Sequence, residues 1–423
     1  MASAATAASA AEIGVLVIGG GAVGLSVAVK LAERQIGRSV LLVERHAKLG
    51  LESSSHNSEV IHASVYYPPN SLKARLCRQG NDMMYALCKE KDIPHANIGK
   101  LLVPKSQVEL RLLPRILATA LASGGQGVKL VNEDELRDLE PNVNAPAAIY
   151  CPTTGIIDSH ALLQSYETSF LSSGGDIALN AEVVAIKKYQ GFPAYKVEIE
   201  DVDLSSPNRK VKSRFSIQAR SIVNCAGLGS ARVAALAGID VDKANYRLHP
   251  TKGVYFRVHK QLNKYPKMLV YPLPINGSVG VHTTPDLHGG MRLGPLETWF
   301  PQRKKGEGGR DSVEDFSHPG NESYYGAEGL DLSVGEEMRE KFVESVRPFL
   351  PFVEATDIAP ESSGIHSKLQ SEQETGMRDW VIKHEVERGL ANFYNLVGIE
   401  SPGLTASPAI GEYVAQLVHS ESK

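Results

Sequence analysis

The chain has 423 residues, of which 42% are hydrophobic and 22% charged, a composition typical of a globular enzyme, and this length favours two domains over one. Its 45 basic and 48 acidic side chains give a net charge of −3, which argues against a nucleic acid or an anionic membrane surface as partner. No apolar run reaches the roughly 18 residues of a spanning helix, so we expect no transmembrane segment.

The N-terminal residues 1–10 are rich in Ala and Ser, and we expect a disordered tail there. The tail lacks the long apolar stretch of a secretory signal, which argues against secretion. It also lacks the arginines typical of a mitochondrial transit peptide, although a very short presequence is possible. A mitochondrial and a cytoplasmic location therefore both stay open. The cysteines show no CxxC pair and no metal-ligand spacing, which predicts buried thiols in a reducing compartment and no metal site.

A dinucleotide-binding motif follows. Residues 15–18 form an apolar, β-branched run typical of a buried strand, and Gly19, Gly21 and Gly24 come directly after it. The first glycine permits a tight turn, the second a close approach of a pyrophosphate, and the third close packing of the next helix, expected over residues 22–35. A second strand over 40–43 ends in Glu44, whose carboxylate can accept the ribose hydroxyls, which favours NAD or FAD over NADP.

The following polar run, residues 51–67, contains HNSEVIH and carries more hydroxyl, amide and imidazole groups than an ordinary surface loop. Such side chains suit contacts to a pyrophosphate and an isoalloxazine ring. A buried strand over 221–224 then ends in small residues, where the backbone can approach a nucleotide. The other elements expected up to this point are helices over 72–91, 107–123, 133–139, 160–171 and 230–237, and strands over 99–104, 148–151, 181–187 and 195–200.

The pattern changes after residue 247. Short strands over 254–258, 268–271, 278–282 and 290–293, separated by prolines, predict an antiparallel sheet in a second structural unit. A polar surface excursion is expected over 301–335, then a helix over 338–349 and strands over 380–382 and 393–397. The run 398–407 is a glycine turn that opens a C-terminal helix to residue 417, a second place where a helix N-terminus can face an anion.

The fold class that these elements predict is α/β (α+β overall), with a Rossmann-like dinucleotide domain and a second, antiparallel-sheet domain. Six segments together resemble FAD-dependent oxidoreductases of the D-amino-acid-oxidase type, most closely the L-2-hydroxyglutarate dehydrogenase branch. They are VIGGGAVGLSVAVKLA, HNSEVIHASVYYPPNSLKARLCRQG, PTTGIIDSHALL, NCAG, GVHTTPDLHGG with RLGP, and NLVGIESPGLTAS.

The resemblance implies bound FAD and a discontinuous FAD domain over about 11–94, 156–244 and 356–423, with a substrate domain over about 95–155 and 245–355. It also implies a set of residues along the cofactor. These are Gly19, Gly21, Gly24, Glu44 and Arg45 at the ADP half; Val184, Ala226 and Gly227 beside it; Ser55, Asn57 and Ser58 at the pyrophosphate and flavin edge; and Ser401, Gly403 and Leu404 at the pyrimidine end.

The reaction implied is oxidation of a small 2-hydroxy acid, L-2-hydroxyglutarate to 2-oxoglutarate, by hydride transfer to flavin N5. A neutral imidazole is the natural acceptor of the hydroxyl proton, and His62 and His282 are the candidate bases. The family usually has an arginine where this chain has His366, and a histidine replaces neither the fork geometry nor the constant charge of arginine. The candidates for binding the substrate are Tyr66, Lys252, Tyr255, Tyr271, Arg292 and His366.

Two other functions stay open at this point. One is an FAD-dependent amine or amino-acid oxidase that returns electrons to O2. The other is an FAD-binding protein without turnover, for which the missing arginine at His366 is the support. A dehydrogenase would need a further electron acceptor, a quinone or an electron-transfer protein, which the sequence does not identify.

Overall fold

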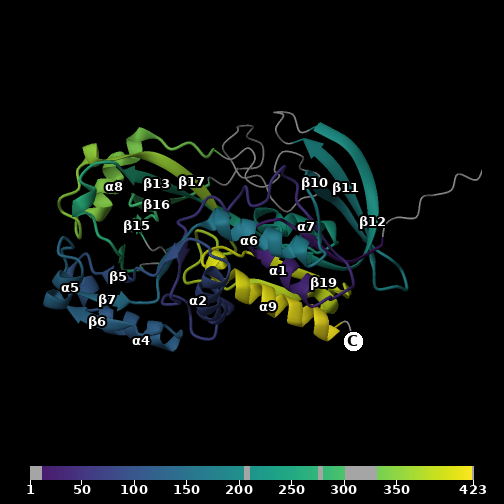
Figure 1. The fold of residues 1–423 in the computed structure, drawn as a ribbon, viewed down its shortest axis with the longest axis horizontal. Coiled ribbons are helices and arrows are strands. Elements are labelled where there is room, and N and C mark those ends of the chain that lie inside the picture. Colours follow the sequence, from purple (N-terminus) through teal and green to yellow (C-terminus); the bar gives the residue numbers. More distant parts are fainter. Residues whose placement is uncertain (1–11, 204–209, 275–279, 301–330, 422–423) are drawn as a thin grey trace, which may run out of the picture.

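The first of two large sheets holds the N-terminal strand at its centre. A computed structural model describes residues 12–203, 210–274, 280–300 and 331–421, and within them the strand order is β10-β11-β12-β1-β2-β9, with β19 beside β12 and β18 beside β19 (Figure 1). Strands β9, β2, β1, β12 and β19 run parallel. The strands are β1 (Glu12–Ile18), β2 (Val40–Val43), β9 (Asp176–Ala178), β10 (Ala181–Lys188), β11 (Tyr195–Asp203), β12 (Lys210–Asn224), β18 (Val381–His384) and β19 (Phe393–Val397).

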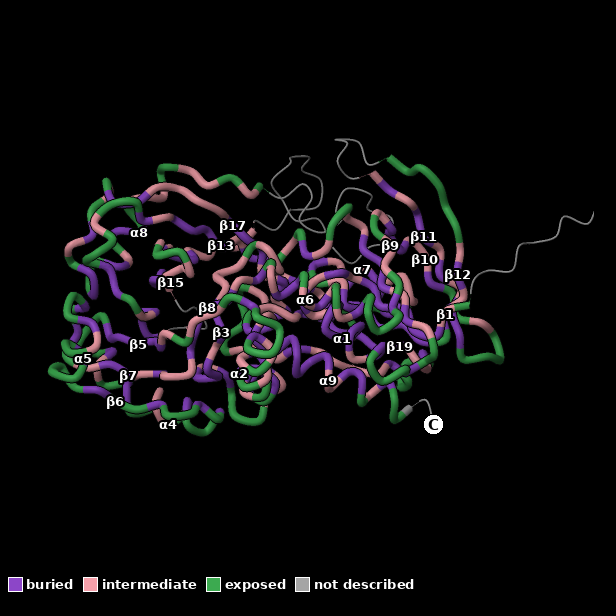
Figure 2. The backbone as a smooth tube through the Cα atoms, in the orientation of Figure 1, coloured by how far each residue is buried: buried purple, intermediate pink, exposed green. Residues whose placement is uncertain are grey.

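One face of this sheet is covered by a layer of helices. The glycine-turn helix α1 (Ala22–Glu33) is buried along most of its length and packs against α6 (Ser159–Ser172) and α9 (Gly403–Glu421), while α2 (Leu72–Glu90) packs against α9 (Figure 2). Asp158 begins α6, because its side chain accepts hydrogen bonds from the first N–H groups of that helix. On the other face, side chains of the sheet, including those of β10 and β11, form a second core with α7 (Ser230–Leu236).

The second sheet lies at the opposite end of the molecule, with the order β17-β13-β16-β15-β14-β5-β7-β6 in the described part of the chain (Figure 1). Its core packs around Phe342 of α8. The strands are β5 (Lys100–Val103), β6 (Lys129–Asn132), β7 (Ala147–Cys151), β13 (His249–Val258), β14 (Leu269–Pro272), β15 (Thr283–Pro285), β16 (Met291–Trp299) and β17 (Ile358–Lys368); the helices are α3 (Gln107–Leu110), α4 (Leu113–Ala122), α5 (Glu133–Leu139) and α8 (Arg339–Val346).

A small third sheet joins the two ends. In it β8 (Gly155–Ile157) pairs with β3 (Val60–Ile61) and with β4 (His95–Ala96). Five short 3-10 turns complete the elements of the described residues: Gly227–Gly229, Leu262–Lys264, Glu336–Met338, Ala355–Asp357 and Glu385–Arg388.

The predicted α/β class with a Rossmann-like half is confirmed, and several details differ. The expected helix over 107–123 is wrong: it is two helices, because the chain turns before the first residues of α4, where Pro114 has no N–H to continue an earlier helix. The expected strand over 278–282 is also wrong, since the strand there is β15 and residues 275–279 lie outside the described residues. The second sheet is mixed rather than antiparallel, because β5 and β14 run parallel.

The predicted domain boundary at residue 356 needs a correction. Strand β17 pairs with β13 over its whole length and so belongs to the second sheet, and the chain rejoins the first sheet only at β18. This pairing joins residues about a hundred positions apart and has no local signal in the sequence. The expected tail over 1–10 and most of the excursion over 301–335 lie outside the described residues.

Candidate active site

A cavity of about 880 Å³ lies where β1 and β2 end, the position at which open α/β sheets bind nucleotides. Gly19 has a φ of +109°, and a Cβ added to it would overlap the backbone of Cys225. A Cβ on Gly24 would overlap the carbonyl oxygen of Gly19, so this glycine sets how closely α1 packs against the strand. Gly19 and Gly21 line the cavity and Gly24 lies behind it. The turn therefore has the shape that close approach of a pyrophosphate requires.

Glu44 lies at the cavity wall after β2 and is buried. One carboxylate oxygen accepts a hydrogen bond from the Gly20 N–H at 2.7 Å, and the other accepts one from the His46 N–H at 2.9 Å. Because each carboxylate oxygen has two lone pairs, these bonds fix the carboxylate and leave it acceptor capacity for ribose hydroxyls.

Arg45 also lines this cavity and forms an ion pair with Glu52, whose Oε1 lies 3.0 Å from His46 Nε2. Burial raises the pKa of Glu52, but the charge of Arg45 and the hydrogen bond with His46 outweigh it and lower that pKa to about 2. The wall therefore carries an ionised Glu52 held by two basic groups.

Two of the expected cofactor residues, Val184 and Ser55, line neither cavity, and the side-chain amide of a third, Asn57, is bonded within its own loop. Val184 does not line the cavity; its neighbour Val183 does, beside a bulge in β10 that alters the alternation of side chains. Ser55 Oγ donates to the carbonyl of Gly50 and lines neither cavity. Asn57 reaches the second cavity, but its side-chain amide is bonded within its own loop, to the carbonyl of Ser54 at 2.8 Å.

Ser54 was missed by the sequence reasoning. Its Oγ accepts a hydrogen bond from the N–H of Ala22 at 3.0 Å, and it lines both cavities. The predicted Ala226 and Gly227 lie in the wall of the nucleotide cavity. Opposite them, Arg232 pairs with the buried Glu182 at 3.0 Å.

The second cavity has a volume of about 1440 Å³ and adjoins the first. Its walls come from both halves of the molecule: the polar run after residue 52, strands β13, β14 and β17, and the turn before α9. The predicted residues in this wall are Asn57, Ser58, His62, Tyr66, Tyr255, Tyr271, His282, His366, Ser401, Gly403 and Leu404. The fold thus brings most of the predicted substrate-side residues together.

His282 is held by its surroundings in one tautomer. Its Nδ1 lies 2.9 Å from the carbonyl oxygen of Gly280, so Nδ1 carries the proton, and its ring stacks on Tyr271 with centroids 3.6 Å apart. Nε2 is buried and has no hydrogen-bond partner among the described residues. Burial and the charge of Lys100 lower the pKa of His282 to about 3, which leaves Nε2 as a lone-pair acceptor.

His62 faces the same cavity from the polar run. Its backbone is fixed on both sides, because its N–H donates to Thr405 Oγ1 at 3.0 Å and its carbonyl accepts from Asn81 Nδ2 at 2.9 Å. Its Nε2 lies 3.3 Å from Ser401 Oγ. Burial, followed by the charges of Lys100 and His282, holds its pKa well below the ordinary value. Both candidate bases are therefore neutral imidazoles.

The tyrosines at this wall are neutral hydroxyl donors. Burial raises the pKa of Tyr255 to about 12, against the opposing effect of a hydrogen bond from Ser58, and burial also raises the pKa values of Tyr66 and Tyr271.

His366, Glu297 and Lys368 form a cluster of three ionisable side chains in the wall of this cavity. Glu297 Oε1 lies 2.8 Å from His366 Nδ1, and its Oε2 lies 2.9 Å from Lys368 Nζ. Burial opposes ionisation of Glu297, but His366 and Lys368 outweigh it and hold its pKa well below the usual range. A second pair, Lys73 with Glu400 at 2.8 Å, lines the same cavity.

Two predicted substrate-binding residues, Lys252 and Arg292, do not line either cavity. Lys252 Nζ donates to the carbonyl of Ser333 at 2.6 Å. Arg292 pairs with Glu361 at 3.2 Å. Both are on strands of the second sheet, and Arg292 also lies 3.6 Å from Glu59, a residue of the cavity wall.

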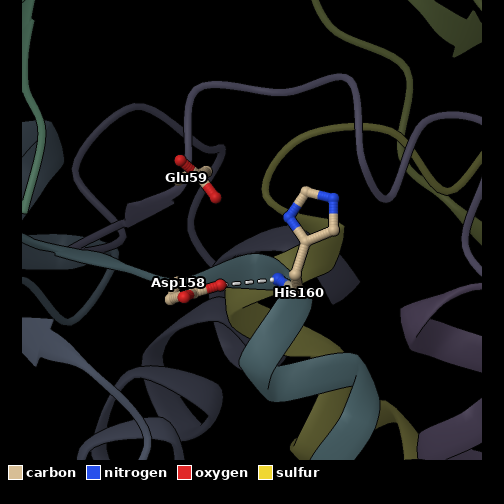
Figure 3. Close-up of side chains that lie close together, drawn as sticks. All are labelled: Glu59, Asp158 and His160. Atoms are coloured by element: carbon tan, nitrogen blue, oxygen red, sulfur yellow. Dashed lines mark hydrogen bonds between the residues drawn. The ribbon is translucent and has the colours of Figure 1, made fainter.

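Glu59, Asp158 and His160 lie close together at the start of α6, with potential ligand atoms within 4.8 Å of one another (Figure 3). The carboxylates already bond the helix: Asp158 Oδ1 accepts from the His160 N–H at 2.9 Å, and Glu59 Oε1 accepts from Ser159 Oγ at 2.8 Å. We interpret this group as a helix cap.

The parallel sheet with its glycine turn, and the second cavity shared with another sheet, are the features of a dinucleotide-dependent enzyme. A family model described as "FAD dependent oxidoreductase" matches residues 14–417, so the chain belongs to this family of FAD-dependent enzymes. FAD is thus the cofactor of this enzyme.

Relatives of similar length share the full span of the chain. It is 31% identical to "L-2-hydroxyglutarate dehydrogenase, mitochondrial" of Arabidopsis thaliana, covering 96% of this chain and 83% of the relative. It is 29% identical to the Homo sapiens protein of the same name, covering 97% and 89%. It is 28% identical to L-2-hydroxyglutarate dehydrogenase of Indibacter alkaliphilus, covering 95% and 98%.

Solved structures share the fold. An L-alpha-glycerophosphate oxidase from Mycoplasma pneumoniae with FAD bound has a TM-score of 0.76 at 22% identity, covering 96% of this chain and 95% of that one. A glycine oxidase from Geobacillus kaustophilus has a TM-score of 0.72 at 18% identity, covering 97% and 95%. In the described part of the chain, none of the helices has the length and apolar character needed to cross a membrane.

Proposed function

We propose that this enzyme oxidises L-2-hydroxyglutarate to 2-oxoglutarate. The observation that carries the proposal is a pair of neutral imidazoles, the buried His282 and the half-buried His62, at one cavity beside the nucleotide site. The relatives that match nearly the whole chain bear the name of this activity. Oxidation of a 2-hydroxy acid removes a proton from oxygen and a hydride from carbon, and the first of these steps needs such a base.

Bound FAD supplies the acceptor for the hydride. The protein supplies the proton acceptor, and His282 Nε2 suits that role because Gly280 fixes the other ring nitrogen as the donor. His62 Nε2, beside Ser401, is the second candidate and can instead hold the substrate hydroxyl. Gly403 and Leu404, the first residues of α9, line the same cavity, and the N-terminal end of a helix favours negative charge.

A diacid substrate needs donors for two carboxylates. Tyr66, Tyr255 and Tyr271 offer hydroxyls at the cavity wall, and Lys368 offers a cation. Lys368 is shared with Glu297, so we propose that it binds a carboxylate by moving between Glu297 and the substrate. His366 bonds the other Glu297 oxygen and helps to hold this carboxylate in place while Lys368 is engaged.

The test is an anaerobic absorbance scan near 450 nm of the purified FAD-loaded protein. The additions are L-2-hydroxyglutarate, D-2-hydroxyglutarate, L-malate, L-lactate, glycine and sarcosine, each alone. Bleaching by L-2-hydroxyglutarate alone is the expected result. Bleaching by another of these compounds would identify a different substrate, and the proposed class of reaction would stand. Bound FAD that none of these acids bleaches would contradict the proposed reaction.

One observation favours a second candidate, an amino-acid or amine oxidase. Glu297 presents an ionised carboxylate at the cavity wall. The ammonium group of an amino-acid substrate could form an ion pair with this carboxylate, whereas the carboxylates of a diacid would be repelled by it. This candidate predicts bleaching by glycine or sarcosine and release of peroxide in air. A 2-hydroxyglutarate dehydrogenase would instead pass electrons to a quinone, a dye or an electron-transfer protein.

We also propose a mitochondrial location, which the names of the plant and animal relatives support. Imaging of the full-length chain with a C-terminal fluorescent tag would test it, and a diffuse cytoplasmic signal would overturn it.

A further inference from the structure

Buried polar atoms without a hydrogen-bond partner among the described residues gather at one wall of the substrate-side cavity, the second of the two cavities. They are His62 Nδ1, Tyr66 Oη, Lys100 Nζ, Tyr271 Oη and His282 Nε2. All of these residues line the cavity except Lys100, which lies against two of their rings. Buried polar atoms in proteins are nearly always paired, and an unpaired one costs free energy. Their concentration at this wall indicates a ligand that supplies the missing partners.

The side chains that carry these atoms form one cluster. The ammonium group of Lys100 lies 4.4 Å from the ring centre of Tyr66 and 4.8 Å from that of Tyr271. The ring of Tyr271 also stacks on the imidazole of His282, with 3.6 Å between centroids. The cluster is drawn from β5, β14 and the segments after β3 and before β15, so only the folded chain brings a cation, two phenols and an imidazole together.

The cluster holds a positive charge that no carboxylate of the described residues balances. Burial lowers the pKa of Lys100 to about 8, so its ammonium group is charged at neutral pH. The nearby thiols of Cys77 and Cys151 stay neutral, because burial raises their pKa values to about 12 and about 11. A buried charge is costly without a counter-ion, and two aromatic rings offset only part of that cost. An anion bound in the cavity would supply the counter-charge.

Two other lysines line this cavity, and each already has a carboxylate. Lys368 pairs with Glu297 at 2.9 Å, and Lys73 pairs with Glu400 at 2.8 Å. Lys100 differs from both, because its Nζ has no partner in the described part of the chain. The wall formed by Tyr66 and Tyr271 is therefore the part of the cavity with an unbalanced positive charge behind it.

We propose that the hydroxyls of Tyr66 and Tyr271 bind the C1 carboxylate of the substrate, and that the charge of Lys100 behind their rings attracts it. The inference rests on the proposed function and adds the orientation of the acid in the cavity. In a 2-hydroxy acid the C1 carboxylate is bonded to the carbon that carries the hydroxyl group, so the two groups must bind side by side. His282, which stacks on Tyr271, offers Nε2 as the acceptor for that hydroxyl.

This orientation assigns the C5 carboxylate of a diacid to Lys368. Lys368 lies on β17, which contributes no side chain to the cluster around Lys100, and its Nζ is shared with Glu297. The two carboxylates of a diacid thus have separate cations, Lys100 for C1 and Lys368 for C5. A monoacid uses only the first of these cations.

The test measures binding without turnover. 2-Oxoglutarate and 2-oxopentanoate are added separately to the oxidised, FAD-loaded protein, and the change in the flavin absorbance spectrum gives each dissociation constant. The two acids share the C1 carboxylate, and the second has a methyl group in place of the C5 carboxylate. Y66F and Y271F are each expected to weaken both acids about tenfold, because a hydrogen bond to a charged group is lost in either complex. K368M is expected to weaken 2-oxoglutarate alone.

Y265F is the matched control. Tyr265 also has a buried hydroxyl without a partner among the described residues, but it lines neither cavity. Both dissociation constants are expected to stay as in wild type. Removing an unpaired buried hydroxyl does not lower stability, so all three Phe variants are expected to unfold at the temperature of wild type or above it.

K100M tests the charge separately. It is expected to weaken 2-oxopentanoate about tenfold and to leave the binding of the neutral amide, 2-oxopentanamide, unchanged, because the ammonium group attracts only the charged ligand. A lysine that serves packing alone would change the binding of both ligands alike or of neither. Either of those results would overturn the role of Lys100.

Folded, FAD-loaded Y66F and Y271F with the dissociation constants of wild type would overturn the proposal. Weaker binding of 2-oxoglutarate alone would also overturn it, because that result would place the C5 carboxylate at this wall. Wild type that binds neither acid would do the same. Failure of L-2-hydroxyglutarate to bleach the flavin would instead contradict the proposed function, while the binding measurements would still test the two tyrosines.

Discussion

The imidazole of His282 lies flat on the phenol ring of Tyr271, with 3.6 Å between ring centres and 18° between planes. The stack and the bond to Gly280 leave the imidazole one orientation, with Nε2 as its unused nitrogen among the described residues. A base that is held in one orientation suits proton transfer, because a small displacement of a catalytic group lowers the reaction rate considerably.

Replacing this base is the first prediction. H282N is expected to slow anaerobic flavin reduction by about 100-fold or more, since a positioned base contributes roughly that much. The change is measured by stopped-flow absorbance at 450 nm. H288N is the matched control, because His288 is exposed in the loop after β15. An unchanged rate in H282N would remove His282 from the mechanism and leave His62, tested by H62N in the same assay.

Stability at mildly acidic pH is the second prediction. The pKa of His282 is about 3 in the folded protein and about 6.5 when unfolded, so between these values the unfolded state binds the extra proton. The free energy of unfolding is therefore highest, with respect to this group, above pH 6.5. It falls as the pH drops below 6.5, by about 2 kcal/mol at pH 5. Thermal unfolding from pH 7.5 to 5 is expected to show this fall, and a smaller one in H282N. Equal slopes in both proteins would contradict the buried, neutral state.

Lys368 gives the third prediction. K368M is expected to raise KM for L-2-hydroxyglutarate about tenfold with a smaller effect on kcat, because a charged hydrogen bond to a carboxylate is lost in ground state and transition state alike. Steady-state kinetics with a dye acceptor measure it. K383M serves as control, since Lys383 pairs with Glu387 outside the cavity. A fall in kcat with KM unchanged would place Lys368 in the chemical step instead.

Gly24 gives the fourth prediction. An added methyl group at this position would overlap the carbonyl oxygen of Gly19 and push α1 away from β1. G24A is therefore expected to purify with less FAD, seen as a lower ratio of absorbance at 450 nm to that at 280 nm. K30A, a change on the outer face of the same helix, should keep its FAD. Full FAD content in G24A would contradict this prediction, because it would show that α1 can shift without loss of FAD binding.

Local signals explain which elements could be predicted from the sequence. The glycine turn, α1 and β2 follow from periodicity and glycine spacing within about thirty residues, and the structure confirms these elements. The place of β17 in the second sheet depends on pairing with β13, about a hundred residues away, and no local pattern encodes it. The resemblance implied Val184, whereas a bulge in β10 alters which side chains face the cavity, and Val183 lines it.

The candidate site divides in the same way. His62 and His282 were predicted because an imidazole in a motif is conspicuous, and both face the substrate-side cavity. Lys252 and Arg292 were chosen for charge alone, and their partners Ser333 and Glu361 come from distant parts of the chain. Lys100 was missed, since a lysine in a strand suggests a solvent-facing position and only the packed sheets show it buried.

The two cavities differ in which part of the chain builds them. The nucleotide cavity takes its wall from the first sheet and its loops, whereas the cavity beside it takes Tyr255, Tyr271 and residues 365–368 from the second sheet. Substitutions on β13, β14 and β17 can therefore change which acid is accepted without touching the groups that hold the cofactor. His366 on β17 is a position of this kind, and such positions are where an engineer seeking a new substrate would begin.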